Sequence, residues 1–589
     1  MKKVMSLVLS ATLASSLFAG CGNSNQSSNS NSQNNSTNSE TTGEDGTSES
    51  DKSVYRVTGS KTKTLNPHMY ESDSESNTMS YIYGSLLRYI VNEAGDNYES
   101  IPYHAVDFPT SNEESTVWTF ELKDGLTFAD GDPITAETYE YSYKMLLDPV
   151  LKNFRATMFF RDVEIKNAKN YFDGKCTWEE VGIKTLEGNK LEITLERPAP
   201  RVNFEMLFAE AGSTSPVNEE LYESCFNAER SENTYGTSLE TTSSSGPYIL
   251  KDWVRDQSRT YVKNEKDPLA SVYTIDEVQE RVVEDATTNL TLFENGDTDY
   301  VSLSGTNYDK YAEDPRLQFS ESAGVWSMYV NSASETNPIL ANKDFRSALF
   351  YGVDRDLIAK EIYKTAKPAP YFVPTFRFLK PGLDYRDTDV AKALIPENNG
   401  FDGNKSVEFF NKAYEANGNK QIIAQLKYFD TSDSMKKMAE FLEEQYEGLF
   451  GTDKFDLQLQ AIPWQSAYED MEKGNYDLAF GSWGGWVFNP WAGMEVYVSD
   501  YQGKHDRFAN AEFDELFKRT MKGDLLFKEE ERLAALGRME EIMYEEVAFI
   551  PIYQSRSAAL FSDRVTLPTK KYLPVVGFGT LQAEIAPLD

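Results

Sequence analysis

Alternating apolar and polar residues predict several β-strands along the chain. In the segment "TVWTFELKDG", the side chains of Trp118, Phe120 and Leu122 point to one face and polar side chains point to the other. Asp124 and Gly125 then form a tight turn. Further strands are predicted at 191–200, 455–464 and 547–555.

Helical spacing of apolar residues predicts helices between these strands. In the segment 133–149, Thr135 is placed to cap the helix, Glu137 suits its first turn and Pro149 ends it. The segment 434–451 carries apolar residues at helical spacing: Met435, Met438, Leu442 and Leu449. Two more amphipathic helices are predicted at 512–522 and 530–546. Strands and helices alternate irregularly, so we expect an α/β fold with mixed sheets.

The first twenty residues have the pattern of an export signal. Lys2 and Lys3 precede a short apolar stretch, and small residues come just before Cys21 in "LFAGC". This pattern resembles a bacterial lipobox, which implies cleavage before Cys21 and a lipid on its sulfur. Residues 21–52 that follow are almost all polar, so we expect a disordered Ser- and Asn-rich tether. We therefore expect the mature protein to be anchored only by lipid on the outer face of the cytoplasmic membrane.

The length and charge of the mature chain limit its class. The formal net charge is −36, and loss of Lys2 and Lys3 with residues 1–20 makes it −38, which excludes nucleic acid as a partner. The remaining chain is longer than the roughly 250–300 residues that one core holds, so two or three lobes are expected. Cys176 and Cys225 either pair or stay free.

No motif in the sequence predicts catalysis, a metal or a cofactor. The three histidines are not spaced as metal ligands, and no nucleophile elbow or phosphate-binding loop is present. Residues 130–132 ("DGD") lack the further oxygen ligands of a calcium loop, so a plain turn is predicted. A hydrolase with a hidden carboxylate pair and a surface adhesin stay open as alternatives.

Six segments, taken in order, carry a shared set of motifs. They read "KTLNPHMYESDSESNTMSYIYGSLLRY", "WTFELKDGLTFADGDPITAETYEYSYKMLLDP", "SSGPYILKDW", "VKNEKDP", "NKDFRSALFYGVDRDLIAKEIYKTAKPA" and "AFIPIYQS". Together they resemble the oligopeptide-binding lipoproteins of bacterial ABC importers, the peptide- and nickel-type family 5 of extracytoplasmic solute-binding proteins. The resemblance covers nearly all of residues 53–589.

The resemblance implies a two-lobed, periplasmic-binding-protein-like (Venus flytrap) α/β fold with an extra domain inserted in lobe I. The implied divisions are lobe I at 53–92, 209–325 and 549–589, domain II at 93–208, and lobe III at 326–548. The implied function is capture of an oligopeptide in the cleft between lobes and its delivery to a membrane permease with ATPases. No enzyme activity and a monomer are expected. The alternative is the same transport role with a non-peptide solute such as an oligosaccharide.

The resemblance also places a ligand site around "GSWGGWVFNPW". Relatives have W-x-x-D-Y-x-x-P there, and the aspartate holds the α-ammonium group of the peptide. Trp486 stands at the aspartate position, and Met471 and Phe480 stand where relatives can carry arginine. Either the amine is held elsewhere, with Glu71, Ser72 and Asp73 as candidates, or the ligand is not an ordinary peptide. The candidate ligand residues are therefore Glu71, Ser72, Asp73, Trp483, Trp486 and Asn489, while Trp491 is read as a packing anchor.

Overall fold

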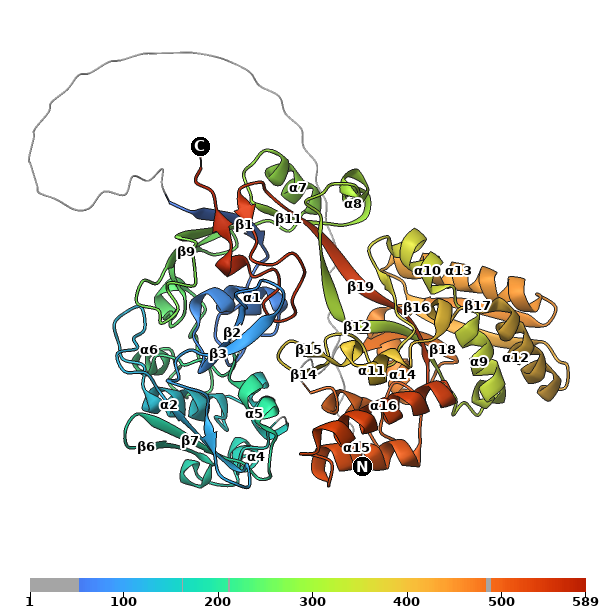
Figure 1. The fold of residues 1–589 in the computed structure, drawn as a ribbon, viewed down its shortest axis with the longest axis horizontal. Coiled ribbons are helices and arrows are strands. Elements are labelled where there is room, and N and C mark those ends of the chain that lie inside the picture. The colour runs from blue at the N-terminus through green and yellow to red at the C-terminus, as the bar shows by residue number, and fades with distance from the viewer. Residues whose placement is uncertain (1–51, 162, 210–211, 484–488, 589) are drawn as a thin grey trace, which may run out of the picture. The chain divides into compact units, whose positions relative to one another are not determined.

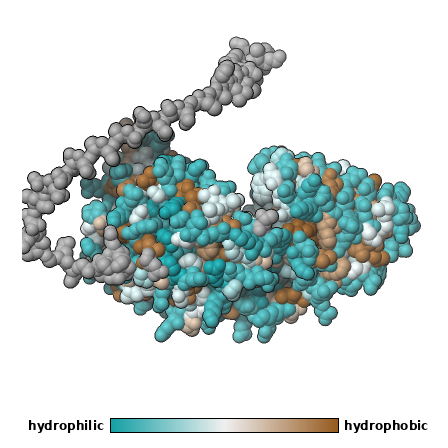
Figure 2. Space-filling model, turned by 90° about the horizontal axis from the view of Figure 1, so that it is seen from above, coloured by the Kyte–Doolittle hydropathy of each residue, from teal (hydrophilic) through white to brown (hydrophobic). Residues whose placement is uncertain are grey.

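The structure is a computed structural model that describes residues 52–161, 163–209, 212–483 and 489–588. Contacts divide the chain into the units Met1–Ser48 and Glu49–Asp589, and every described residue belongs to the second. The predicted signal at 1–20 and all of the predicted tether at 21–52 except Lys52 therefore lie outside the described residues. On the face shown in Figure 2, hydrophilic residues predominate and hydrophobic residues lie in small groups.

A four-stranded mixed sheet forms near the start of the described chain. Its order is β1 (Val54–Gly59), β10 (Glu277–Val282), β9 (Ser258–Lys263) and β8 (Tyr248–Val254). β1 runs parallel to β10, and the other neighbours are antiparallel. Helix α1 (Asp73–Ile82) packs near β8, and the core between them is rich in tyrosine, including Tyr83, Tyr248 and Tyr261.

A second sheet contains the strands predicted first from the sequence. Its antiparallel order is β4 (Thr110–Ser111), β5 (Val117–Glu121), β7 (Lys190–Thr194) and β6 (Ile183–Leu186). Trp118, Phe120 and Leu122 are all buried, as predicted. Helix α2 (Ala136–Leu146) packs on β6 and β7, and the Thr135 side chain caps it, which confirms the predicted helix start.

The largest sheet has seven strands and is also mixed (Figure 1). Its order is β11 (Tyr300–Leu303), β19 (Ile550–Phe561), β12 (Gln318–Val330), β18 (Leu478–Trp483), β16 (Ile422–Phe429) and β17 (Phe455–Ile462), with β13 (Lys367–Pro368) beside β19. β16 is parallel to both β17 and β18, whereas β12 is antiparallel to β18 and β19. The strand predicted at 547–555 thus starts later and runs further, as β19.

The remaining elements are short strands and the helices that cover the sheets. The two-stranded pairs are β2 (Leu87–Val91) with β3 (Tyr98–Pro102), β14 (Phe378–Lys380) with β15 (Leu383–Asp384), and β20 (Val565–Thr566) with β21 (Glu584–Ile585). The helices are α3 (Met158–Arg161), α4 (Ala168–Phe172), α5 (Arg201–Leu207), α6 (Glu219–Ser224), α7 (Ala286–Glu294), α8 (Gly305–Tyr311), α9 (Lys343–Tyr351), α10 (Arg355–Leu357), α11 (Asp389–Lys392), α12 (Gly403–Ala416), α13 (Asp433–Phe450), α14 (Trp464–Lys473), α15 (Ala511–Lys522) and α16 (Glu529–Glu546).

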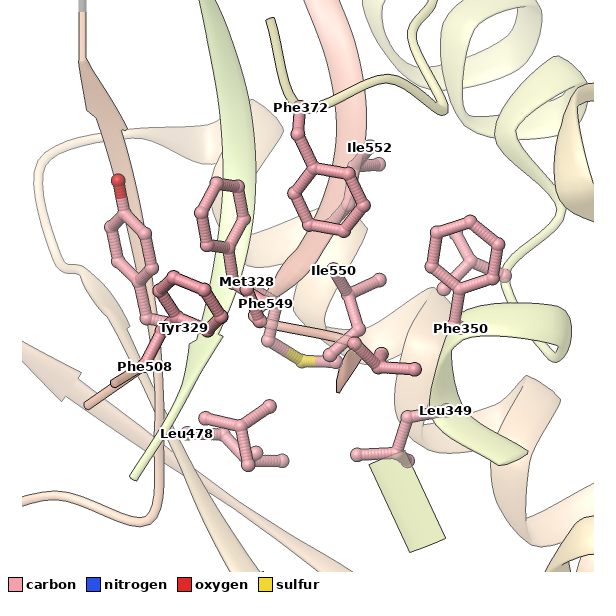
Figure 3. Packing of buried hydrophobic residues seen from close by; sticks show 14 of the residues in the cluster. Met328, Tyr329, Leu349, Phe350, Phe372, Leu478, Phe508, Phe549, Ile550 and Ile552 are labelled. Atoms are coloured by element: carbon pink, nitrogen blue, oxygen red, sulfur yellow. The ribbon is translucent and has the colours of Figure 1, made fainter. Parts of the chain in front are cut away.

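The main core lies against the seven-stranded sheet. Met328 of β12, Leu478 of β18 and Ile550 of β19 meet Leu349 and Phe350 of α9 (Figure 3). The predicted helix at 434–451 is α13, which ends at Gly451 and buries Met435, Met438 and Leu442. The helices predicted at 512–522 and 530–546 are α15 and α16. Helix α13 packs on β16 and β17, and α15 and α16 pack on each other. Such tertiary packing supplies most of a helix's stability in a folded protein.

β12 and β19 connect two separate hydrophobic clusters. At one end, Ala558 and Leu560 of β19 belong to a small cluster with α7 and β11. At the other end, Met328 and Ile550 belong to the main core. Two adjacent long strands therefore tie the regions expected to be lobes I and III. The boundaries predicted for the three domains stay a prediction.

Gly246 in the "SSGPY" segment lies against the backbone of Tyr83. A methyl group at Gly246 would meet the Tyr83 carbonyl carbon at 2.5 Å and its nitrogen at 2.8 Å. Backbone atoms cannot yield as a side-chain tip does, so we expect Gly246→Ala to lower the free energy of unfolding by about 1–3 kcal/mol. Gly448→Ala, in helix α13 with open space around it, is the control and should be neutral or stabilising. Equal denaturation midpoints for the two variants would contradict this account.

Two further expectations are settled by the structure. Cys176 and Cys225 are both free, so the open question of their pairing is answered. The side chains of Asp130 and Asp132 both accept hydrogen bonds from Asn218, as part of a turn in which Gly131 has a φ of 101°. That geometry supports the predicted plain turn.

Candidate functional site

Aromatic side chains gather where β16 and β17 end. We call Trp326, Phe429, Trp464, Tyr468 and Tyr553 the aromatic cluster. The rings of Phe429 and Trp464 have centroids 4.3 Å apart, and those of Trp464 and Tyr468 are 4.4 Å apart. Trp326 packs edge-on to Trp464 at 6.1 Å and stacks on Tyr553 at 6.3 Å.

The aromatic cluster is built by elements that converge on one edge of the sheet. Phe429 is the last residue of β16, and Trp464 opens α14 just after β17 ends. Ligands of α/β proteins bind outside the carboxyl ends of parallel strands, because the connecting segments splay apart there. Trp464 is 46% exposed, which is unusual for so large an apolar side chain.

Trp483 and Trp491 have different roles in the structure. Trp491 is buried, its indole N–H donates to the Arg532 carbonyl at 2.8 Å, and the Arg532 guanidinium lies 3.9 Å from the ring centroid. These contacts confirm that Trp491 is a packing anchor. Trp483 is partly buried against the main core, and its buried Nε1 has no hydrogen-bond partner among the described residues.

The other candidates from the tryptophan-rich segment are placed only in part. Trp486 lies outside the described residues, which resume at Asn489. The Asn489 side-chain oxygen accepts a hydrogen bond from the backbone N–H of Ala492 at 3.1 Å. This oxygen is thus engaged in a local turn.

Glu71, Ser72 and Asp73 meet at the start of α1. Ser72 is the N-cap and forms a capping box with Glu75, whose carboxylate also accepts the backbone N–H of Glu71 at 2.9 Å. The side chain of Glu71 is exposed. Asp73 opens the helix, and its side chain lies outside the described residues. The structure therefore gives Ser72 a helix-capping role, whereas a ligand role for Glu71, Ser72 and Asp73 stays a prediction.

Helix α1 also lines a cavity of about 820 Å³, here called the α1 cavity. Ser74, Asn77, Thr78 and Tyr81 contribute from α1, at the spacing of one helix face. The other walls come from β1, from β2, from the segment 572–582 and from single residues of β10, β11, β12 and β19. This size lies within the range of small-molecule sites.

Arg88 and Glu280 are the charged residues among those that line the α1 cavity, and both have partners within the protein. Glu280 accepts two hydrogen bonds from Arg259, at 2.6 and 2.9 Å, and one from the Tyr261 hydroxyl at 2.7 Å. Arg88 donates to the carbonyl oxygens of Ser80 and Tyr83. The cavity is therefore polar, and both of its charged groups are already hydrogen-bonded within the protein.

Trp326, Trp464 and the α1 cavity were not predicted from the sequence. Trp464 follows a predicted strand directly, but its neighbours in sequence carry no sign that it stays exposed. In the sequence, Ser74, Asn77 and Tyr81 of α1 are spaced so that they lie on one helix face. That this face lines a cavity together with the segment 572–582 depends on contacts between distant parts of the chain.

Met471 and Phe480, at positions where relatives can carry arginine, are completely or almost completely buried in the main core. An apolar side chain there gives no charge to a ligand. The described part of the aromatic cluster therefore offers ring faces, ring edges and hydroxyl groups rather than ions.

Comparison with known proteins identifies the family. Residues 99–505 match the sequence profile described as "Bacterial extracellular solute-binding proteins, family 5 Middle". The chain belongs to this family. Its mixed α/β architecture is the two-lobed fold of family 5 solute-binding proteins, as the resemblance predicted.

Curated relatives of this family 5 protein align along most of their length. Dipeptide-binding protein DppE of Bacillus subtilis (strain 168) is 24% identical over 472 residues, which cover 80% of this chain and 82% of the relative. Periplasmic oligopeptide-binding protein OppA of Escherichia coli (strain K12) is 24% identical over 537 residues, covering 87% and 89%. Both names describe binding proteins.

Solved structures share the fold of this family 5 protein. Listeria monocytogenes OppA bound to peptide superposes with a TM-score of 0.63 at 22% identity, covering 91% of this chain and 100% of the other. The periplasmic murein tripeptide-binding protein MppA in its unliganded open form gives 0.72 at 22% identity, covering 91% and 97%. Within the described residues, no helix is both long and apolar enough to cross a bilayer.

Proposed function

We propose that this family 5 protein is the lipid-anchored, extracytoplasmic receptor of an ABC importer and that it captures oligopeptides for the permease and its ATPases. The bound solute lies between the lobes and contacts the aromatic cluster. The protein acts by binding and release, without catalysis. A ligand that touches both lobes binds the closed form more tightly than the open form, so it favours closure. The permease then recognises the closed, ligand-bound form.

The observation that carries this proposal is the aromatic cluster at the carboxyl edge of β16 and β17. It leaves Trp464 half exposed, and β18 of the same sheet ends at the candidate ligand residue Trp483. A peptide presents the same backbone groups at every residue, so strand-like hydrogen bonds can hold it independently of sequence. Aromatic walls then accept varied apolar side chains.

Calorimetric titration of the mature chain with short peptides and with oligosaccharides tests the ligand class. We expect peptides to bind with a negative heat-capacity change, because apolar side chains leave water for the aromatic cluster. Thermal stabilisation by oligosaccharides together with no heat from any peptide would reject the proposal in favour of a sugar receptor.

The lipid anchor gives a separate prediction. Replacing Cys21 with serine removes the only sulfur that the lipobox presents for lipidation. We expect Cys21→Ser to move the protein from the membrane fraction to the released fraction while its peptide affinity stays unchanged. Fractionation followed by immunodetection measures this, with Cys176→Ser as the matched control. Continued membrane association of Cys21→Ser after a high-salt wash would contradict the anchor.

A further inference from the structure

The chemistry of the α1 cavity differs from that of the aromatic cluster. Hydroxyl and amide groups line it, among them those of Ser74, Asn77, Thr78, Tyr81, Tyr300 and Tyr572. Each hydroxyl group both donates and accepts a hydrogen bond. Such a lining matches a ligand that itself carries many hydroxyl groups.

Aromatic rings form a connected row in the same wall. The Tyr300 and Phe561 centroids are 5.2 Å apart, Phe561 and Phe578 are 5.5 Å apart, and Phe578 and Tyr572 are 5.4 Å apart. The apolar C–H face of a sugar ring packs on rings of this kind while its hydroxyls reach the polar groups around it. A site for fatty chains would lack the hydroxyls, and a site for an ion would offer a free charge.

The two charged groups at the cavity already have partners within the protein: Glu280 is ion-paired with Arg259, whereas Arg88 keeps its charge and is hydrogen-bonded to backbone carbonyls. Glu280 is held by Arg259 and Tyr261, and the guanidinium of Arg88 lies 5.6 Å from the Tyr273 ring centroid besides donating to carbonyls. A ligand ammonium group would find no free carboxylate among the lining residues, because Glu280 is paired with Arg259. A ligand carboxylate would have to compete with the Ser80 and Tyr83 carbonyls for the N–H groups of Arg88. The lining therefore selects a neutral group.

In the cavity wall formed by the segment 572–582, the backbone conformation is fixed by the protein's own packing. Val575 has a φ of 81°, which is rare for a β-branched residue, and the Leu573 N–H donates to the Gly577 carbonyl at 2.8 Å. Gly579, at a φ of 65°, has no room for a side chain, because a Cβ there would lie 2.5 Å from a methyl carbon of Val91. Strained backbone of this kind persists where the surrounding packing fixes it, and it gathers at ligand sites.

We propose that the α1 cavity binds a neutral sugar ring carried by the peptide ligand. This inference rests on the proposed peptide-binding function. Helix α1 begins beside the predicted ligand residue Ser72, its N-cap, and its following residues line the cavity. A peptide held at the start of α1 therefore has the cavity along the same helix. The ligand class is then a glycosylated peptide.

The test compares one short peptide with the same peptide carrying a single O-linked glucose on serine, by calorimetry on the mature chain. We expect the glycosylated peptide to bind at least about tenfold more tightly, the effect of one or two added hydrogen bonds with stacking. Asn77→Ala and Tyr81→Phe each remove one polar group from the cavity and should lower that gain. Neither should change affinity for the unmodified peptide.

Three results would overturn the inference. They are equal affinity for the two peptides, an equal gain from glucuronic acid in place of glucose, and a matching loss of affinity for both peptides in Asn77→Ala. The last would assign the cavity to the peptide backbone or side chains. Absence of any peptide binding would instead contradict the proposed function, so the two failures are distinguishable.

Discussion

Replacing Glu540 with glutamine is expected to lower the free energy of unfolding by about 3–5 kcal/mol, the cost of breaking a buried ion pair. Glu540 of α16 is completely buried and forms an ion pair with Arg386, whose side chain is 6% exposed. Its carboxylate also accepts the backbone N–H groups of Phe372 and Val373 at 3.1 and 3.0 Å, and the Tyr385 hydroxyl at 2.9 Å.

The size of this effect follows from what remains after the substitution. Glutamine keeps the shape of Glu540 but removes its charge, so the Arg386 guanidinium stays buried without a carboxylate. The amide also has one oxygen and one NH2 group, so the two donors that face the NH2 group lose their acceptor. Glu540 thus fastens this segment to α16, and its loss affects the fold around the main core.

Glu541→Gln is the matched control for this prediction. Glu541 is the next residue of α16, is about half exposed and accepts a hydrogen bond from Arg538, which keeps Glu512 and Glu545 as partners. We expect a change within about 0.5 kcal/mol, as for exposed ion pairs. Denaturant unfolding followed by circular dichroism measures both variants, and equal midpoints would show that the Glu540 network does not stabilise the fold.

Replacing Trp464 with alanine is expected to weaken peptide binding by about 10- to 100-fold, with little loss of stability. Removal of a large apolar contact from a ligand interface costs about 1.5–3 kcal/mol, and each 1.4 kcal/mol is a factor of ten in affinity. Stability should change little because Trp464 is already 46% exposed in the protein. Calorimetry with the peptide used for the wild-type chain measures the affinity.

Phe527→Ala supplies the control for Trp464→Ala. Phe527 is 54% exposed and is not among the rings of the aromatic cluster. Its loss should leave peptide affinity unchanged. If Trp464→Ala also binds peptide normally, or if it unfolds before its affinity can be measured, the aromatic cluster is a packing feature and the peptide lies elsewhere.

The local pattern of apolar and polar residues predicted many helices and strands, because the side chains within each element determine where it forms. The face of Trp118 and Phe120 has period two, and Thr135 sits where a helix needs an acceptor, so β5 and the start of α2 followed from neighbours in sequence. The extent of β19 did not follow, because its length depends on pairing with β11 and β12, more than two hundred residues away. Tertiary pairing sets such boundaries.

The site was harder to predict than the fold for a physical reason. Glu540 reads as one more acid on an exposed helix, and only its burial against Arg386 reveals its role. Trp464 and Trp491 are chemically alike, yet one is half exposed and the other is buried. The exposure of a side chain depends on the folded chain and cannot be predicted from its neighbours in sequence. The segment around Trp483 was predicted as a site only through the resemblance to family 5.

The most direct test of the central claim is mass spectrometry of ligands that co-purify with the native, membrane-anchored protein. The chain is extracted in mild detergent, freed of unbound solutes and denatured, and the released small molecules are identified and counted. We predict oligopeptides at about one per chain, and their loss from the Trp464→Ala variant. Release of free oligosaccharides or other non-peptide solutes, with no peptide in any preparation and none retained after peptide is added, would contradict the account.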